Sequence, residues 1–207
     1  RLKHVDVRGC ENLNVSDLIE QISTASKKLQ TLKIGHYSLD GLPFNMFKLK
    51  KIKQLFIDNS CINSLPTSFN KFKGKSVIFR HCTFSTPEKV FKNLGKAKNL
   101  KNLEINSCLF GHNNWKISRS LTLEKINIIN CGLVKIPLVP LEFPKLKELN
   151  LMGNKIPKSA VTWETPKTIL GVDYNAISYT EKDLKKWKYK SIRPEVKRMI
   201  YPEVGDV

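Results

Sequence analysis

Five cysteines and four histidines are the residues of this chain that could hold a metal ion or act as nucleophiles. No two cysteines lie close enough in sequence to form the paired ligands of a typical zinc site. His36 and His81 occupy equivalent positions two predicted strands apart, which places them about 10 Å from each other. That separation is too long for two ligands of one metal ion. The sequence therefore predicts no metal site, with zinc or a disulfide as the less favoured alternatives for the cysteines.

Catalytic motifs are also absent from the sequence. It holds no G-x-S-x-G nucleophile turn, no phosphate-binding glycine loop, no H-E-x-x-H motif and no glycine-rich dinucleotide fingerprint. The carboxylates of Asp58 and Glu104 belong to different strands two repeats apart, so they do not predict a hydrolase pair. We therefore expect a non-enzymatic protein with no cofactor and no small-molecule substrate.

A repeated phrase predicts the elements that must position these residues. Eight times, two apolar residues flank one intervening position, and an apolar anchor follows five residues later, or six in the first copy, where it is Leu13. Alternate side chains of a strand share a face, so each phrase predicts a short strand. Stacking the eight strands would bury one continuous core. The intervening positions are Asp6, Lys33, Phe56, Ile78, Glu104, Asn127, Asn150 and Gly171.

The phrase has the form L-x-x-L-x-L-x-x-N/C-x-L, which resembles the leucine-rich repeat family. About eight repeats of roughly 21–27 residues mix a leucine-proline type with a cysteine-ladder type. The resemblance implies an α/β solenoid with a curved parallel β-sheet on the concave face. Short helices, 3-10 helices or extended returns would form the convex face. We expect residues 1–177 to form this solenoid and residues 178–207 to form a C-terminal cap helix and basic tail.

The start of the solenoid is expected to be uncapped. Leu2 already occupies a core position of the repeat. A solenoid needs a polar cap over its terminal repeat to remain soluble. We therefore expect that an N-terminal cap is missing, and that further residues or a partner cover this edge.

Four of the cysteines fall on the repeat position that asparagine holds in the last two repeats. In members of the family this side chain turns inward and hydrogen-bonds to the backbone of the neighbouring loop. Cysteine is small, mostly buried and a weak donor, so it can fill the same position. We expect a structural ladder formed by Cys10, Cys82, Cys108, Cys131, Asn154 and Asn175.

The segments that connect the strands are of two kinds. Prolines follow the anchors at Leu42-Pro43, Leu65-Pro66 and Ile136-Pro137, which favours extended or short helical returns. Two longer connections carry helical patterns. Ser16 and Thr86 are the expected caps of these helices.

The solvent-facing positions of the predicted sheet include apolar residues in adjacent strands. Neighbouring strands lie about 4.8 Å apart, so the members of each pair should touch. Contiguous exposed apolar surface marks interaction sites, although isolated exposed hydrophobes are normal. The expected partner-binding residues are the apolar Phe56, Ile78, Ile129 and Met152, with Lys33, Asp58, Arg80, Glu104, Asn106 and Asn127 around them.

The net charge of +18 is the strongest compositional feature, and thirty of the thirty-six basic residues are lysine. Such a balance suits nucleic acid, an anionic membrane surface or an acidic protein. An AT-rich coding sequence would also enrich lysine without any binding role. Lysines recur in the turns before the strands, on the predicted convex side and its rim. A local cluster with aromatic neighbours forms the expected basic tail: Lys185, Lys186, Lys188, Lys190, Arg193, Lys197 and Arg198.

Two functions follow from these patterns. The leading interpretation is a protein-interaction or scaffold module that binds a polypeptide on the concave face. The alternative is a basic structural subunit of a ribonucleoprotein or another large assembly, which contacts nucleic acid or an anionic surface through its lysines and tail. Cysteines without disulfides favour a reducing, intracellular compartment. A processed, secreted or organellar chain stays open, because the sequence does not begin with methionine.

Overall fold

The structure is a computed structural model. The predicted cap helix and basic tail at 178–207 lie outside the residues that it describes, as do His36 and Asn175. For residues 38–39 and 169–171 the description covers the backbone alone. The described residues are 2–10, 12–35, 38–39, 42–112, 114–139, 142–156 and 169–171.

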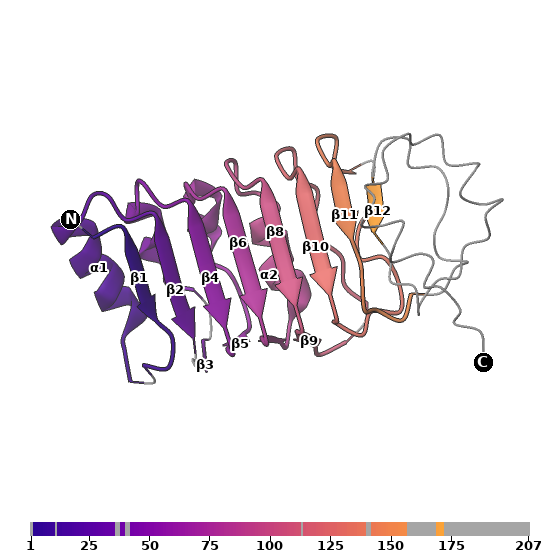
Figure 1. Ribbon diagram of the computed structural model, residues 1–207, viewed down its shortest axis with the longest axis horizontal. Coiled ribbons are helices and arrows are strands. Elements are labelled where there is room, and N and C mark those ends of the chain that lie inside the picture. The colour runs from indigo at the N-terminus through magenta and orange to yellow at the C-terminus, as the bar shows by residue number, and fades with distance from the viewer. Residues whose placement is uncertain are drawn as a thin grey trace, which may run out of the picture.

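Eight parallel strands form one large sheet, and each strand coincides with one apolar phrase of the sequence (Figure 1). The strands follow one another across the sheet in chain order. Flanking residues such as Leu55 and Ile57 are fully buried, as the phrase predicts. The predicted α/β fold with a parallel sheet is confirmed. The strands are β1 (His4–Val7), β2 (Thr31–Gly35), β4 (Gln54–Asp58), β6 (Ser76–Arg80), β8 (Asn102–Asn106), β10 (Lys125–Ile129), β11 (Glu148–Asn150) and β12 (Ile169–Gly171).

A second, narrower parallel sheet follows the turns at the ends of the long strands. The turn residues adopt left-handed backbone conformations, with φ of 46° at Asn59 and 50° at His81. These turns direct the anchors Ile62 and Phe84 into the core, where both are fully buried. The sequence predicted the anchors but not that they form strands. These strands are β3 (Ser38–Leu39), β5 (Cys61–Ile62), β7 (Thr83–Phe84) and β9 (Leu109–Phe110).

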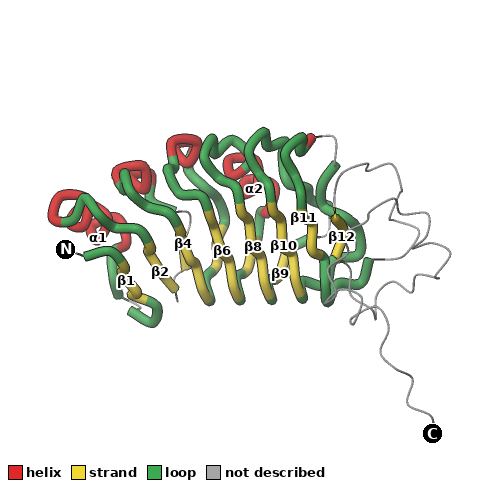
Figure 2. Tube along the Cα trace, turned by 45° about the horizontal axis from the view of Figure 1, so that its top comes forward, coloured by secondary structure: helices red, strands yellow, loops and turns green. Residues whose placement is uncertain are grey.

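The returns between repeats carry the helices, which Figure 2 shows beside the strands. Pro43 and Pro66 each precede a 3-10 helix, in agreement with the short helical returns expected after a proline. Because a proline has a fixed φ and no N–H to leave unsatisfied, it suits the start of such a turn. The helical segments are α1 (Val15–Ala25), η1 (Phe44–Lys48), η2 (Thr67–Lys71) and α2 (Pro87–Leu94).

The cap of α1 differs from the expected residue, whereas Thr86 is the cap residue of α2 as expected. Asn14, not Ser16, caps α1: its side-chain oxygen accepts from the backbone N–H groups of Ser16 and Asp17. The Asn amide reaches the first-turn donors from outside the helix, which is the usual capping geometry. Thr86 does precede α2, but its hydroxyl makes no cap bond and instead donates to the carbonyl of Asn63.

The core runs continuously between the large sheet and the returns. Its centre is aromatic: the rings of Phe91 and Trp115 stack with centroids 4.7 Å apart, and those of Phe110 and Trp115 lie 4.3 Å apart. Phe84 packs against both Phe91 and Phe110. Burial of each such side chain stabilises the fold by about 1.5–3 kcal/mol. Consecutive repeats are therefore joined by shared aromatic packing as well as by strand pairing.

The first strand forms an edge of the large sheet. Val5 and Val7 in β1 are only half-buried, whereas Leu32 and Ile34 in β2 are fully buried. Leu2, which the repeat places at a core position of an uncapped first repeat, is 49% exposed. The reason is that β1 has a neighbouring strand on one side only.

Candidate partner-binding site

The face of the large sheet that points away from the core carries the predicted site residues, and we call it the sheet face. Strand register places these residues in two columns. Phe56 pairs with Ile78 in one column, and Asp58 pairs with Arg80 in the other. The columns are Asp6, Lys33, Phe56, Ile78, Glu104, Asn127 and Asn150, and then Gly35, Asp58, Arg80, Asn106 and Ile129.

The apolar pair in the N-terminal half of the sheet face is covered by arginines. Phe56 and Ile78 are adjacent as predicted, but each is only 8% exposed. The expectation that they form an exposed patch is therefore wrong. The guanidinium carbons of Arg8 and Arg80 lie 5.3 and 5.1 Å from the centre of the Phe56 ring. Guanidinium groups at this range attract the face of an aromatic ring, so the two arginines close over Phe56.

Carboxylates hold both arginines in this position. Arg8 donates to Asp6 at 2.8 and 2.9 Å and to Asp58 at 3.4 Å, and Arg80 pairs with Glu104 at 3.0 Å. Hydrogen bonds from Arg8 lower the pKa of Asp6 to about 2. The charges of this half of the sheet face are thus directed at one another.

Gly35 makes the contact between the first and third strands of this network possible. A Cβ atom at Gly35 would lie 2.8 Å from the carbonyl oxygen of Asp58 and 3.2 Å from Cγ of Arg8. The missing side chain leaves room for Arg8 to cross β2 and reach Asp58. Sequence analysis missed this role, because a glycine in a strand is informative only once its neighbours are known.

The C-terminal half of the sheet face carries mainly amide and apolar side chains. Its outward residues Lys125 and Glu148 pair with each other at 2.7 Å, and beyond this pair its outward residues are uncharged and half-buried. Within it the Asn150 side chain accepts from the backbone N–H of Met152 at 3.1 Å. The buried Oδ1 atom of Asn127 has no hydrogen-bond partner in the described part of the chain. We call this surface the neutral patch: Asn106, Asn127, Ile129, Asn150 and Met152.

A ladder of inward side chains supports the turns at the end of the sheet. The thiol of Cys82 donates to the carbonyl of Ile57 in the preceding repeat at 3.6 Å, and Cys108 donates to that of Phe79 at 3.6 Å. Asn154 makes the strongest version of this contact, at 2.7 Å to Ile128. Each rung therefore ties one turn to the repeat before it. The further rung is Cys131, which donates to Ile105.

The ladder differs from its expected composition at two positions. Cys10 is exposed rather than inward. Each of these rungs donates to a strand in the repeat before it, and the described part of the sheet begins at β1, in the repeat that holds Cys10. Ser60 occupies the same repeat position, is buried and donates to the carbonyl of Asp58 at 2.7 Å. Counting three residues beyond the second apolar residue of its phrase would have identified it.

Cys108, in the middle of the cysteine ladder, is held in its neutral thiol form. Hydrogen bonds with the Cys131 and Cys82 thiols, together with burial, raise the pKa of Cys108, which disfavours its thiolate. Among the described residues, no group of three or more histidine, cysteine or acidic side chains could hold a metal ion. No helix in the described part of the chain has the length and apolar character to cross a membrane.

No family model matches the sequence, and no curated protein matches it. A solved structure titled as the leucine-rich repeat domain of the type III effector XCV3220 (XopL) is similar, with 17% sequence identity and a TM-score of 0.45. The likeness covers 67% of this chain and 57% of that chain, less than two thirds of the other protein's domain.

Proposed function

We propose that this protein is a binding module that holds a polypeptide segment on the neutral patch of its sheet face. The observation that carries the proposal is the contrast within that face. The N-terminal half covers its apolar pair with charged side chains, whereas the neutral patch keeps Ile129 and Met152 half-exposed, and the Lys125–Glu148 ion pair lies beside it. Apolar groups with amide neighbours are typical of the centre of a protein interface, where charged residues are depleted.

The chemistry of the patch indicates what such a segment would offer. A side chain of the partner would fill the space beside Ile129 and Met152, which belong to adjacent repeats. The amides of Asn106 and Asn150 provide donors for the partner's backbone carbonyls. Rotation of Asn127 about its side chain would turn its buried oxygen toward a donor of the partner and satisfy it. A segment with an apolar residue and free backbone groups suits this arrangement.

A capture experiment tests this proposal. The double variant Ile129→Asp, Met152→Asp introduces charge at the centre of the patch, and we expect it to lose partners that the wild-type protein recovers from an extract of the source cells. The matched control is Leu109→Asp, because Leu109 is 68% exposed and lies outside the patch in β9. The control should recover the same partners, and all three proteins should unfold at similar temperatures. A partner that still binds the double variant at wild-type level would contradict the proposal.

A further inference from the structure

A second surface lies along the N-terminal ends of the strands of the large sheet. Four segments of this edge, 27–28, 50–53, 71–75 and 96–101, hold eleven lysines and no aspartate or glutamate. All eleven lysines are exposed. We call this surface the lysine rim.

Backbone hydrogen bonds place the segments of the lysine rim side by side. The N–H of Lys53 donates to the carbonyl of Gln30 at 2.7 Å, that of Lys75 to Lys53 at 2.8 Å, and that of Lys101 to Lys75 at 2.9 Å. Figure 1 shows the corresponding loops together at the end of the sheet opposite the arrowheads. Strands are spaced about 4.8 Å apart, so the rim from β2 to β8 is about 15 Å long. Lysines from distant parts of the sequence thus form one continuous row.

Most lysines of this row have no carboxylate within ion-pair distance among the described residues. Within the described residues, Lys101 is the one rim lysine with a carboxylate within ion-pair distance, its partner being Glu124. Glu124 also pairs with Lys147 and so ends the row on that side. The amino groups of Lys50 and Lys71 lie 6.0 and 5.7 Å from the ring centre of Phe47, which positions them without neutralising them. The rim therefore keeps a strong positive potential.

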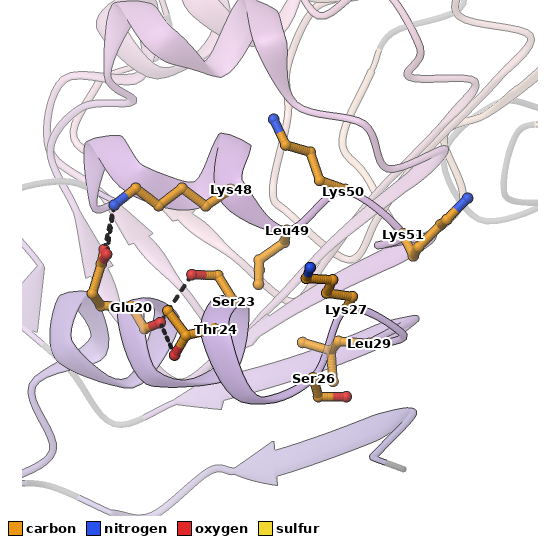
Figure 3. A pocket seen from close by; sticks show the side chains of 10 residues that line it. All are labelled: Glu20, Ser23, Thr24, Ser26, Lys27, Leu29, Lys48, Leu49, Lys50 and Lys51. Carbon is orange, nitrogen blue, oxygen red and sulfur yellow. Dashed lines mark hydrogen bonds and ion pairs between the residues drawn. The ribbon is translucent and has the colours of Figure 1, made fainter.

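A hollow of about 480 Å³ lies beside the rim, and its lining does not suit a compact anion. Leu29 and Leu49 contribute apolar surface to it, and residues from the last turn of α1 line one side. In Figure 3 the amino groups of Lys27, Lys50 and Lys51 diverge instead of meeting at one point. The negative end of the α1 dipole also disfavours a compact anion there. Separated charges of this kind suit a ligand whose own charges are spread over a long distance.

We propose that the lysine rim binds the phosphate backbone of a double-stranded nucleic acid without reading its sequence. Over about 15 Å a duplex presents roughly nine phosphate charges, matching an extended row of lysines. A single strand would need exposed aromatic rings for its bases, but Phe72 in the rim is fully buried, and the half-buried Phe47 ring lies beside the amino groups of Lys50 and Lys71. This surface is separate from the neutral patch and does not depend on the function proposed for it.

Two other polyanions fit the rim less well. An anionic membrane favours basic residues with apolar side chains that can insert, but the apolar residues of the rim segments, such as Ile52 and Leu100, are buried. Lysine is depleted in protein–protein interfaces, whereas arginine and aromatic residues are enriched there. The rim holds lysine as its only charged residue type.

Fluorescence anisotropy with a labelled 20-base-pair DNA duplex, and with the RNA duplex of the same sequence, tests the proposal. The rim variant carries Lys51→Gln, Lys53→Gln and Lys75→Gln. Each lost phosphate contact lowers the slope of log K against log salt by about 0.9, so we expect the slope to fall by about 2.7 on DNA. The Kd at about 100 mM salt should weaken at least tenfold. Binding only one of the two duplexes would identify which nucleic acid the rim selects and would support the proposal.

The matched control carries Lys89→Gln, Lys116→Gln and Lys155→Gln, which are exposed lysines outside the rim. It has the same net charge as the rim variant, so it should keep nearly the wild-type affinity and slope. Equal weakening by both variants would overturn the proposal in favour of a net-charge effect. Absence of duplex binding at 50 mM salt, or tighter binding of the single strand, would also overturn it. The proposal would also be overturned if the rim variant lost binding to phosphatidylserine vesicles or to polyglutamate while its duplex binding stayed unchanged.

Discussion

The sheet face and the lysine rim are adjacent surfaces of the same strands, yet the arginines of the first are paired with carboxylates and, within the described part of the chain, most lysines of the second are not. On the sheet face Arg8 and Arg80 each have a carboxylate partner and lie over an aromatic ring. On the rim only Lys101 has one among the described residues. The contrast indicates that the position of the charges, not their number, distinguishes the two surfaces.

The largest change in the free energy of unfolding is expected at Phe56, where two arginines cover the sheet face. Phe56→Ala should lower the free energy of unfolding by about 3 kcal/mol, because it removes a buried ring and the surface on which Arg8 and Arg80 rest. Chemical denaturation measures this change. Phe44→Ala is the control, because Phe44 is 67% exposed and should cost little. A Phe56 variant as stable as this control would mean that the face is open like the rim.

A smaller loss is expected from Gly35→Ala. The added Cβ would lie 2.8 Å from the backbone oxygen of Asp58, which cannot move without displacing β4. We expect the free energy of unfolding to fall by about 1–3 kcal/mol, the usual range for overpacking. The same measurement on Arg8→Ala should show a smaller loss, since that change removes an exposed ion pair. If Gly35→Ala were neutral, the glycine would not be what lets Arg8 reach Asp58.

Neutralising one charge on each surface should change stability in opposite directions. Arg80→Gln removes the pair with Glu104 and should cost up to about 1 kcal/mol. Lys75→Gln removes a like charge between Lys53 and Lys101 and should stabilise by a few tenths of a kcal/mol at low salt. The second effect should disappear in about 1 M salt, where charges on adjacent strands are screened. Thermal unfolding at two salt concentrations measures both, and destabilisation by Lys75→Gln would show that the rim charges are paired after all.

The strands and the inward ladder were accessible to sequence analysis to different degrees. All eight long strands follow from the repeat, because burial of the phrase residues is a local property of each copy. The exposure of Phe56 could not be predicted in the same way, since Arg8, which covers it, lies far away in sequence and arrives only through the gap at Gly35. Cys10 was misassigned for a related reason: an inward rung needs a repeat before it. Contacts across repeats are therefore the part that the pattern does not contain.

The smallest expected effect is a change in the pKa of Glu124, which lies where the lysine rim ends. Hydrogen bonds from Lys101 and Lys147 lower the pKa of Glu124 to about 2. A carboxyl with a lowered pKa contributes stability above its unfolded pKa of about 4.3, and that contribution is lost as the pH falls through about 2. NMR titration of the Glu124 carboxyl should show its midpoint rising in Lys101→Gln, while Lys116→Gln leaves it near 2. An unchanged midpoint in Lys101→Gln would mean that Glu124 does not hold Lys101, so that the free charge of the rim would extend to that lysine.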